Sequence, residues 1–368
     1  MTTDELYGHS LHLLKDLIRT PSLSKEEDKT ASIIGDYLTF HGVSFVQKGN
    51  NIIARNAQFD PQKPTILLNS HHDTVKPNEG YTNDPFEPIE KDGKLFGLGS
   101  NDAGGCLVSL IGTFIHFYKN ELPYNLILAA TAEEENSGKD GVESILPDLP
   151  IPEFGIVGEP TELKMGVAEK GLMVLDCYAK GKSGHAARDT GINAIYMAMK
   201  DIDWFKNFEF PVISKHLGPV KMTVTQIESG YQHNVVPDVC HFVVDVRSTD
   251  KFSNTQILEI VKQHVKCEVK ERSTRLNPSS LPEDLLVSKV ADLLKIEKFG
   301  SPTTSDQAVM NFPTFKMGPG MSERSHTADE FIYLDEIKEG IVGYIKLLDR
   351  LFSESSKYQN PITKIREV

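Results

Sequence analysis

Three short apolar segments, each followed directly by ionisable residues, constrain the fold of this chain more than any other feature. The apolar segments span residues 65–68, 126–130 and 155–157, and the polar clusters behind them span residues 70–73, 131–135 and 158–160. Uninterrupted apolar segments of this length are typical of strands buried on both faces of a parallel sheet. In open α/β sheets, ligands bind beyond the carboxyl ends of the strands. We therefore predict a parallel sheet at whose edge the three polar clusters converge on one site.

Helical patterns surround these strands. Apolar residues recur at helical spacing over residues 11–18, which predicts a first helix that ends near Pro21. Ser24 and Glu27 form an S-x-x-E capping box, which predicts a second helix that runs to about Phe40. Later in the chain we expect a helix at 286–294, a strand at 314–317 and a C-terminal helix at 335–352. These elements assign residues 1–165 and 276–368 to one α/β domain.

The order of elements changes between residues 166 and 275. Strands are predicted at 172–178, 220–227, 239–246 and 267–271, and helices at 193–205 and 255–265. The resulting order, βαββαβ, is that of a ferredoxin-like split domain. We therefore expect an α/β protein in which residues 166–275 form a second domain inserted into the first.

Composition excludes several classes of partner. The chain has 39 Lys and Arg against 52 Asp and Glu, a net charge of −13, and it lacks the basic face that nucleic-acid binding requires. No apolar run approaches the ~18–20 residues that cross a bilayer, and the first twenty residues do not resemble a signal peptide. Four cysteines without a C-x-x-C pair indicate neither a disulfide framework nor a thiolate zinc site. We expect a cytoplasmic protein with no nucleic-acid or membrane partner.

The first two polar clusters contain residue types that bind divalent metals. His71 and Asp73 form an H-x-D pair, in which the carboxylate can fix the tautomer of a ligating imidazole, although an isolated pair is a weak signal. Glu133, Glu134 and Glu135 are three consecutive carboxylates that repel one another unless cations lie among them. Taken alone, this run is equally well explained as a solvated acidic loop.

Three further residues favour the metal site over that alternative. Asp102 lies in the glycine-rich segment 97–105, Glu159 follows the third apolar segment, and His326 lies late in the chain. A glycine-rich turn with a helix cap at Asp102 remains the alternative for that segment, whereas a phosphate site is disfavoured because the P-loop pattern is absent. Oxygen and imidazole ligands without thiolate suit zinc, cobalt or manganese.

Eight motifs in this order resemble the M20 family of co-catalytic zinc aminoacylases and peptidases, especially its acetylornithine deacetylase and succinyl-diaminopimelate desuccinylase branches. The likeness covers nearly the whole chain. The motifs are the H-x-D at His71, the G-x-G-x-x-D at 97–102, the carboxylates at 133–135, the Gly-Glu-Pro-Thr at 158–161, the S-G-H at 183–185, the Asn-Val-Val-Pro at 234–237, the D-x-R at 245–247, and the Gly-Pro-Gly at 318–320 with His326.

The resemblance implies a zinc-exopeptidase-like catalytic domain with an inserted lid and dimerisation domain, and hence a homodimer. It also implies two divalent metal ions, zinc with cobalt or manganese as alternatives. Their ligands would be His71 and Glu159 on one ion, Glu135 and His326 on the other, and Asp102 as the bridge. Asp73 would orient His71, and Glu134 would be the general base. Three ligand carboxylates against four positive charges would leave a positive centre that activates water.

Three residues of the inserted domain are further candidates. By resemblance, His185 would stabilise the oxyanion of the tetrahedral intermediate in the neighbouring subunit; a hydrogen-bonded loop histidine is an equally good interpretation of the sequence. Arg247 is suited to bidentate capture of a substrate carboxylate, with Asn234 as a polar contact. An internal ion pair between Arg247 and Asp245 explains the D-x-R motif nearly as well.

The leading hypothesis is a metal-dependent deacylase that hydrolyses the amide of a small N-acyl-L-amino acid of the acetylornithine or acetylcitrulline type, as in arginine biosynthesis. A succinyl-diaminopimelate-type desuccinylase or an M20 di- or tripeptidase is the alternative within the family. A two-metal phosphodiesterase and a metal-binding protein without catalysis are the alternatives outside it. The first is disfavoured because Arg247 is the only well-placed basic group for a phosphate, and the second because the base and all ligands are present.

Overall fold

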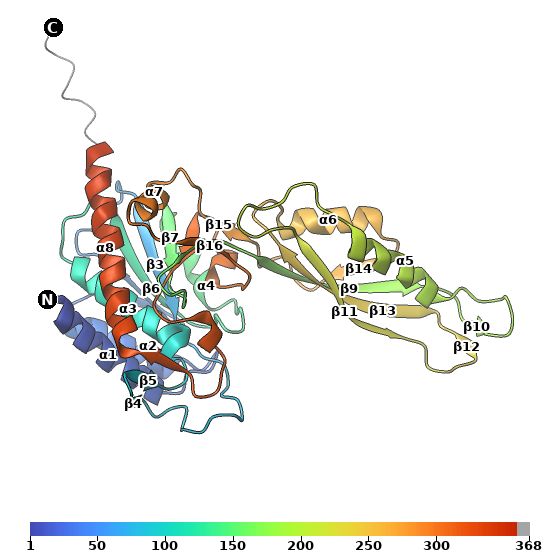
Figure 1. Ribbon diagram of the computed structural model, residues 1–368, viewed down its shortest axis with the longest axis horizontal. Helices are drawn as coiled ribbons and strands as arrows, with labels where there is room; N and C mark the ends of the chain where they lie inside the picture. The colour runs from blue at the N-terminus through green and yellow to red at the C-terminus, as the bar shows by residue number, and fades with distance from the viewer. Residues whose placement is uncertain (359–368) are drawn as a thin grey trace, which may run out of the picture. The chain divides into compact units, whose positions relative to one another are not determined.

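The computed structural model describes residues 1–358 and divides the chain into two compact units (Figure 1). Unit 1 comprises residues 1–167, 281–299 and the chain from residue 305 onward, and unit 2 comprises residues 168–280 and 300–304.

Unit 1 is built on a twisted sheet whose central strands are parallel. The strands lie in the order β1 (Phe45–Lys48), β2 (Asn51–Arg55), β6 (Asn125–Thr131), β3 (Thr65–His71), β7 (Phe154–Val157), β17 (Thr314–Lys316), β8 (Met165–Glu169) and β15 (Ser279–Ser280), with β16 (Lys298–Ser301) also paired to β8. Strand β3 runs parallel to both β6 and β7. The predicted parallel sheet is therefore confirmed, and its three predicted strands are neighbours.

Helices cover both faces of this sheet. The core on one face includes side chains from α1 (Thr3–Arg19), α2 (Asp28–Phe40), α3 (Gly105–Phe117), α7 (Leu286–Leu293) and α8 (Leu334–Tyr358). The other face packs on α4 (Val142–Ile145), with η2 (Leu146–Asp148) and η3 (Asp306–Val309) beside it. Ile66 and Leu68 belong to the first core and Leu67 to the second, because successive side chains of a strand point to opposite faces. This double burial explains why β3 is apolar without alternation.

Short elements complete unit 1 around the loops that carry the predicted metal ligands. They are the helical turns η1 (Ser100–Gly104) and η4 (Ser322–Arg324) and the three-stranded sheet of β4 (Ile89–Lys91), β5 (Lys94–Phe96) and β18 (Phe331–Tyr333).

The capping box predicted at the start of α2 is wrong. Glu27 is the N-cap residue of α2, but no side chain caps the helix. Instead, the Ser24 hydroxyl donates to Asp73 Oδ2 at 2.7 Å, and the Glu27 carboxylate accepts from the backbone N–H of Lys25 at 2.7 Å and of Glu133 at 3.2 Å. Ser24 therefore bonds the loop after β3, Glu27 bonds the loop after β6 and its own neighbour Lys25, and neither side chain caps the first turn of α2.

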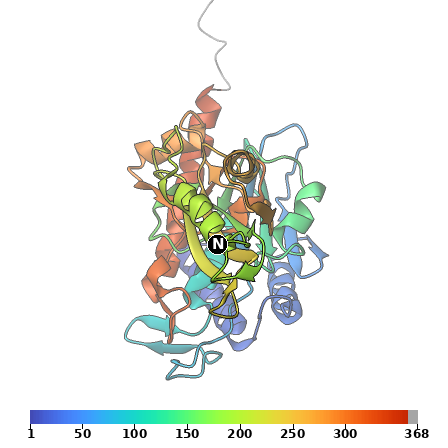
Figure 2. The ribbon, with the colours of Figure 1, turned by 90° about the vertical axis from the view of Figure 1, so that its right-hand side faces the viewer.

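Unit 2 has the predicted split βαββαβ order. Its elements are β9 (Gly171–Lys180), α5 (Ala194–Asn207), β11 (Lys221–Ser229), β13 (Val239–Ser248), α6 (Asn254–His264) and β14 (Glu268–Glu271), and the sheet order is β11-β13-β9-β14. Helices α5 and α6 lie on one face of this sheet (Figures 1 and 2) and enclose a core of their own. A separate two-stranded ribbon pairs β10 (Gly184–His185) with β12 (Val235–Val236).

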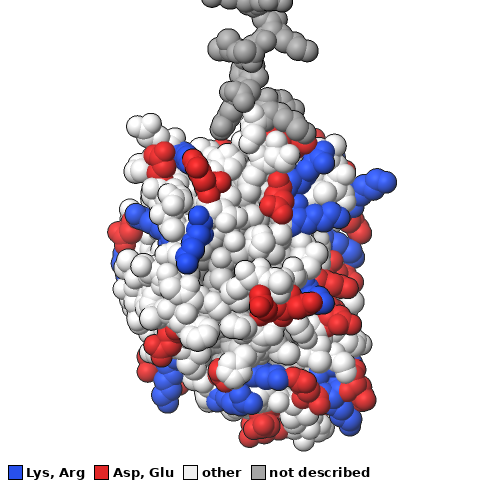
Figure 3. Space-filling view, turned by 90° about the vertical axis from the view of Figure 1, so that its left-hand side faces the viewer, with Lys and Arg blue, Asp and Glu red and all other residues white. Residues whose placement is uncertain are grey.

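Surface charge, helix length and cysteine state can be compared with the composition. On the face drawn in Figure 3, acidic and basic side chains are interspersed and form no continuous basic patch. Within residues 1–358, no helix combines the length and apolar character needed to cross a bilayer. All four cysteines are free thiols.

Candidate metal centre

The carboxyl ends of three neighbouring strands meet at one edge of the unit 1 sheet (Figure 1). His71 is the last residue of β3, Glu134 and Glu135 follow β6, and Glu159 follows β7. Asp102 reaches the same edge from the turn η1, which precedes α3. The strand order β6-β3-β7 therefore brings together the polar clusters that are far apart in the sequence.

Four of the predicted ligands form a tight cluster. His71, Asp102 and Glu135 each offer one ligand atom within 4.8 Å of the others. The Asp102 carboxylate lies between two imidazoles, since its Oδ1 is 3.3 Å from His71 Nε2 and its Oδ2 is 3.7 Å from His326 Nε2. His326 Nε2 also lies 3.0 Å from Glu135 Oε2. Asp102 therefore has one histidine near each of its two carboxylate oxygens.

Asp73 anchors the glutamate turn more directly than it anchors His71. Its backbone carbonyl lies 3.0 Å from His71 Nδ1, whereas its carboxylate is 3.4 Å from that atom. The two carboxylate oxygens accept from the backbone N–H groups of Glu134, at 3.0 Å, and Glu135, at 3.1 Å. Asp73 therefore fixes both the imidazole ligand and the backbone that carries the predicted base.

The ionisable groups of this cluster perturb one another strongly. Burial raises the pKa of Glu134 well above its ordinary value, and the charges of Glu159 and Asp306 add to this rise against the opposing effect of His71. The hydrogen bond to Glu135 raises the pKa of His326 to about 9. Burial would lower the pKa of His71, but hydrogen bonds to Asp102 and Asp73 outweigh it and raise that pKa well above its ordinary value. Without cations, protons must neutralise part of this acidic cluster.

The donor set fits divalent metal ions. Among the ion pairs of residues 1–358, Asp102, Glu134 and Glu135 pair with histidines and with no lysine or arginine. His71 and Asp73 have side chains that are 1% and 0% exposed, so this concentration of carboxylates and imidazoles is largely out of water. Buried carboxylates are stable when paired or bound to metal ions. A candidate His/Asp/Glu metal site is therefore present.

The predicted residues of unit 2 lie on two parts of that unit. His185, in β10, pairs with Val235 of β12, and the backbone N–H of Ala186 donates to the Asn234 carbonyl at 2.9 Å. Arg247, in β13, makes a bidentate ion pair with Asp245 through Nε and Nη2, at 2.8 and 3.2 Å.

The strand register separates Arg247 from Asn234. Arg247 pairs with Lys221 at the start of β11, whereas Asn234 follows the end of β11, where Ser229 pairs with Cys240. His185 and Asn234 therefore lie together within the chain, and Arg247 lies at the opposite end of the sheet.

Sequence reasoning missed two buried residues that support the site. Glu330, which is 2% exposed, accepts from the backbone N–H groups of Asn101 and Asp102, at 2.8 and 2.9 Å. Burial and the charge of Asp102 raise the pKa of Glu330 to about 8. Asp306 accepts from the Thr131 hydroxyl at 2.9 Å, and burial raises its pKa to about 6. The sequence could have pointed to Glu330, because this residue lies between His326 and the apolar strand β18. No comparable sequence feature marks Asp306.

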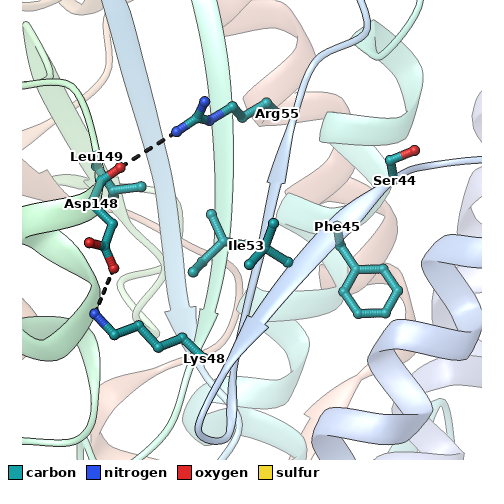
Figure 4. A pocket seen from close by; sticks show the side chains of 8 residues that line it. Ser44, Phe45, Lys48, Ile53, Arg55, Asp148 and Leu149 are labelled. Atoms are coloured by element: carbon teal, nitrogen blue, oxygen red, sulfur yellow. Dashed lines mark hydrogen bonds and ion pairs between the residues drawn. The ribbon is translucent and has the colours of Figure 1, made fainter.

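A cavity of about 360 Å³ lies elsewhere in unit 1, beside β1 and β2 (Figure 4). Its lining includes Phe45, Ile53 and Leu149, together with Lys48, whose Nζ lies 2.6 Å from Asp148 Oδ2. No histidine lines this cavity, and its lysine is paired with its aspartate. Within residues 1–358, the group of side chains close enough to share a metal ion is the one at the edge of the sheet described above.

Comparisons with known proteins identify one family. Residues 67–350 match the family described as peptidase family M20/M25/M40. The acetylornithine deacetylase of Buchnera aphidicola subsp. Schizaphis graminum is 26% identical over 362 residues, covering 89% of this chain and 94% of the relative. The succinyl-diaminopimelate desuccinylase of Nitratiruptor sp. is 26% identical over 268 residues, covering 69% of this chain and 72% of the relative.

Two solved structures share the fold. Aminopeptidase PepT from Bacillus cereus superposes with a TM-score of 0.74 at 18% identity, covering 94% of this chain and 98% of that one. The YXEP protein of Bacillus subtilis, described as a dinuclear metal binding peptidase, has a TM-score of 0.73 at 18% identity, covering 95% and 99%. The predicted α/β fold with a second domain is thereby confirmed.

Proposed function

We propose that this chain, which belongs to the M20/M25/M40 family of peptidases, is a deacylase that hydrolyses the amide of a small N-acyl-L-amino acid. Family membership confirms the broader expectation of a metal-dependent amidohydrolase. The finer proposal covers the acyl group, the amino acid and the roles of individual residues. It is carried by the cluster in which Asp102 lies between His71 and His326, with Glu134 beside it.

The residues divide between metal binding and proton transfer. His71 and Glu159 would hold one divalent ion, Glu135 and His326 the other, and Asp102 would bridge them. Zinc is the expected metal, with cobalt or manganese as alternatives. Bound ions would polarise the amide carbonyl and lower the pKa of a water molecule at the site.

Glu134 is suited to the role of general base. Its Oε2 lies 3.9 Å from His71 Nε2, so its carboxylate borders the ligand cluster, and Asp73 fixes its backbone. Glu134 would take a proton from the attacking water and deliver it to the leaving nitrogen as the C–N bond breaks. The products are a carboxylate and a free amino acid.

Residues of unit 2 supply the remaining roles in this proposal. His185 would stabilise the oxyanion, and Asn234, its neighbour in the β10-β12 ribbon, would provide a polar contact. Arg247 would bind the substrate carboxylate through Nη1, since its ion pair with Asp245 uses Nε and Nη2. By resemblance to its family, the chain would act as a homodimer through unit 2, in the cytoplasm.

The relatives favour an acetylated amino acid of the ornithine type as substrate, and the citrulline type belongs to the same proposal. Acetylornithine deacetylases match this chain at 26–28% identity over 88–89% of its length. The desuccinylase and the peptidases named above keep the alternatives open. One methylene or one charge in the pocket decides among such substrates.

A substrate panel with matched variants tests the proposal. We expect the metal-loaded protein to hydrolyse N-acetyl-L-ornithine or N-acetyl-L-citrulline with a higher kcat/KM than N-succinyl-diaminopimelate or a dipeptide. Glu134→Gln should retain both metal ions and lose about 10²–10⁴-fold in kcat. The control is Glu133→Gln, the same change one residue away, which should stay within about threefold of wild type. Near-normal turnover by Glu134→Gln would show that Glu134 is not the general base.

A further inference from the structure

We propose that Glu330 is a positioning residue that fixes Asp102 relative to His326, and thereby sets the affinity for the metal ion that both would hold. This inference rests on the proposed function, because it assigns to Glu330 the task of holding two of its ligands together. Glu330 itself is no metal ligand in this proposal, and it touches no reacting atom.

Glu330 connects two loops that are remote in sequence. Its Oε1 accepts from the backbone N–H groups of Asn101, at 2.8 Å, and Asp102, at 2.9 Å, across 228 residues or more of chain. Its backbone carbonyl accepts from the N–H of Gly97 at 3.0 Å. Because Glu330 follows His326 by four residues, both its side chain and its backbone tie the His326 loop to the Asp102 loop.

Asn101 makes a second tie between the same loops. Its Oδ1 accepts from the Met321 N–H at 3.0 Å, and its Nδ2 donates to the Met321 carbonyl at 3.1 Å. Glycine at position 320 leaves space for these two hydrogen bonds. A Cβ on Gly320 would lie 2.5 Å from Asn101 Oδ1, and the φ of Gly320 is +86°. The two loops are therefore joined at both ends of the segment that carries His326.

The His326 loop needs such ties because it has little regular structure. His326 and Asp329 have φ of +60° and +53°, in the left-handed region that most side chains avoid. The side chain of His326 is 56% exposed, so packing alone does not hold it. Its imidazole nevertheless lies 3.0 Å from Glu135 and 3.7 Å from Asp102. Hydrogen bonds of Glu330 and Asn101, together with one between Ser325 and Asp102, join this loop directly to the Asp102 turn.

The geometry distinguishes the hydrogen bonds of Glu330 from its charge. The N–H groups of Asn101 and Asp102 bond the same oxygen, Oε1, so the amide oxygen of a glutamine can replace it in both bonds, and only the weaker interaction with the Gly99 N–H loses its charge. A leucine of similar size removes the acceptor and leaves two N–H groups unpaired in a buried site. Glu330→Gln should therefore act like the wild type, and Glu330→Leu should not.

The test measures Co²⁺ binding by isothermal titration calorimetry and by the visible absorption of the bound ions, with kcat as a second readout. Loss of a residue that orients metal ligands typically weakens metal binding 10–100-fold. For Glu330→Leu we expect this loss for one of the two ions, a changed Co²⁺ spectrum and a lower kcat. Glu330→Gln should stay within about threefold of the wild type. The matched control is Glu323→Leu, at an exposed position of the same loop.

The outcomes separate this inference from the proposed function. If the wild type binds two ions and hydrolyses substrate but Glu330→Leu matches it, the inference is wrong and the function stands. If Glu330→Gln fails as badly as Glu330→Leu, the charge matters instead of the hydrogen bonds, and the inference is overturned. If the wild type binds no metal, the proposed function itself fails. Should Glu330→Leu not fold, Glu330→Asp, which withdraws the acceptor by one methylene, is measured in its place with the same expectation.

Discussion

Replacing Asp73 by asparagine should uncouple the metal ligands from the general base. The wild-type carboxylate accepts from the N–H of Glu134 on one oxygen and from the N–H of Glu135 and the Ser24 hydroxyl on the other. In Asp73→Asn, one of these oxygens becomes an NH₂ group, which must face a backbone N–H. At least one buried backbone N–H therefore loses its acceptor. The hydrogen bond that remains is made to a neutral amide oxygen instead of a charged carboxylate oxygen.

The expected cost follows from those contacts. An unsatisfied buried donor costs about 1–3 kcal/mol, and the structure can avoid that cost by shifting the glutamate turn. A shift of about 1 Å at a catalytic group lowers the rate about 10²-fold. We therefore expect Asp73→Asn to lose 10–100-fold in kcat at saturating metal, with the loss in kcat exceeding any change in KM.

Steady-state kinetics of the metal-loaded variants measure this effect. The control is Ser24→Ala, which removes one donor from the same carboxylate and leaves both backbone bonds in place, so its kcat should stay within about threefold of wild type. The reasoning is refuted if Asp73→Asn keeps wild-type kcat, or if Ser24→Ala loses as much as Asp73→Asn.

Two further predictions concern protons and backbone conformation. In the metal-free protein the hydrogen bond to Glu135 raises the pKa of His326 to about 9, so at pH 7 its imidazole carries a proton that a metal ion must displace. Metal affinity should therefore rise with pH up to about 9. Calorimetry in buffers of different ionisation enthalpy should detect proton release on metal binding. Metal binding that releases no proton at pH 7 would contradict the protonated state of His326. Gly320→Ala should lower the free energy of unfolding by about 1–3 kcal/mol and weaken metal binding, because its Cβ would displace Asn101. Gly42→Ala is the control, since its φ is also positive, at +70°, but open space surrounds it; equal metal affinities of the two variants would refute the role of Asn101.

The part of the site that sequence could predict is the part that regular structure positions. His71 ends an apolar strand, Glu134 and Glu159 follow two others, and parallel strands bring their carboxyl ends to one edge. Asp102 and His326 lie on irregular loops, so their place in the site came from family motifs and not from periodicity. In the structure, Asp102 Oδ2 lies 3.7 Å from His326 Nε2.

Tertiary contacts explain what the sequence could not show. Ser24 and Glu27 have the spacing of a capping box, but their side chains bind Asp73 and the backbone of Glu133 instead. Glu330 is a buried carboxylate next to an apolar strand, but its hydrogen-bond partners lie more than 200 residues away, so no local pattern predicts them. Local patterns predict elements reliably, whereas hydrogen bonds between distant loops depend on the completed fold.

The most direct test of the central claim is a crystal structure of the metal-loaded protein with anomalous scattering data at the absorption edge of the metal. This account predicts two anomalous peaks, about 3.5–4 Å apart, on either side of the Asp102 carboxylate. The ion at one peak should be bound by His71 and Glu159, and the ion at the other peak by Glu135 and His326. Peaks bound by other residues, or no peak at this edge of the sheet in a metal-replete crystal, would contradict it.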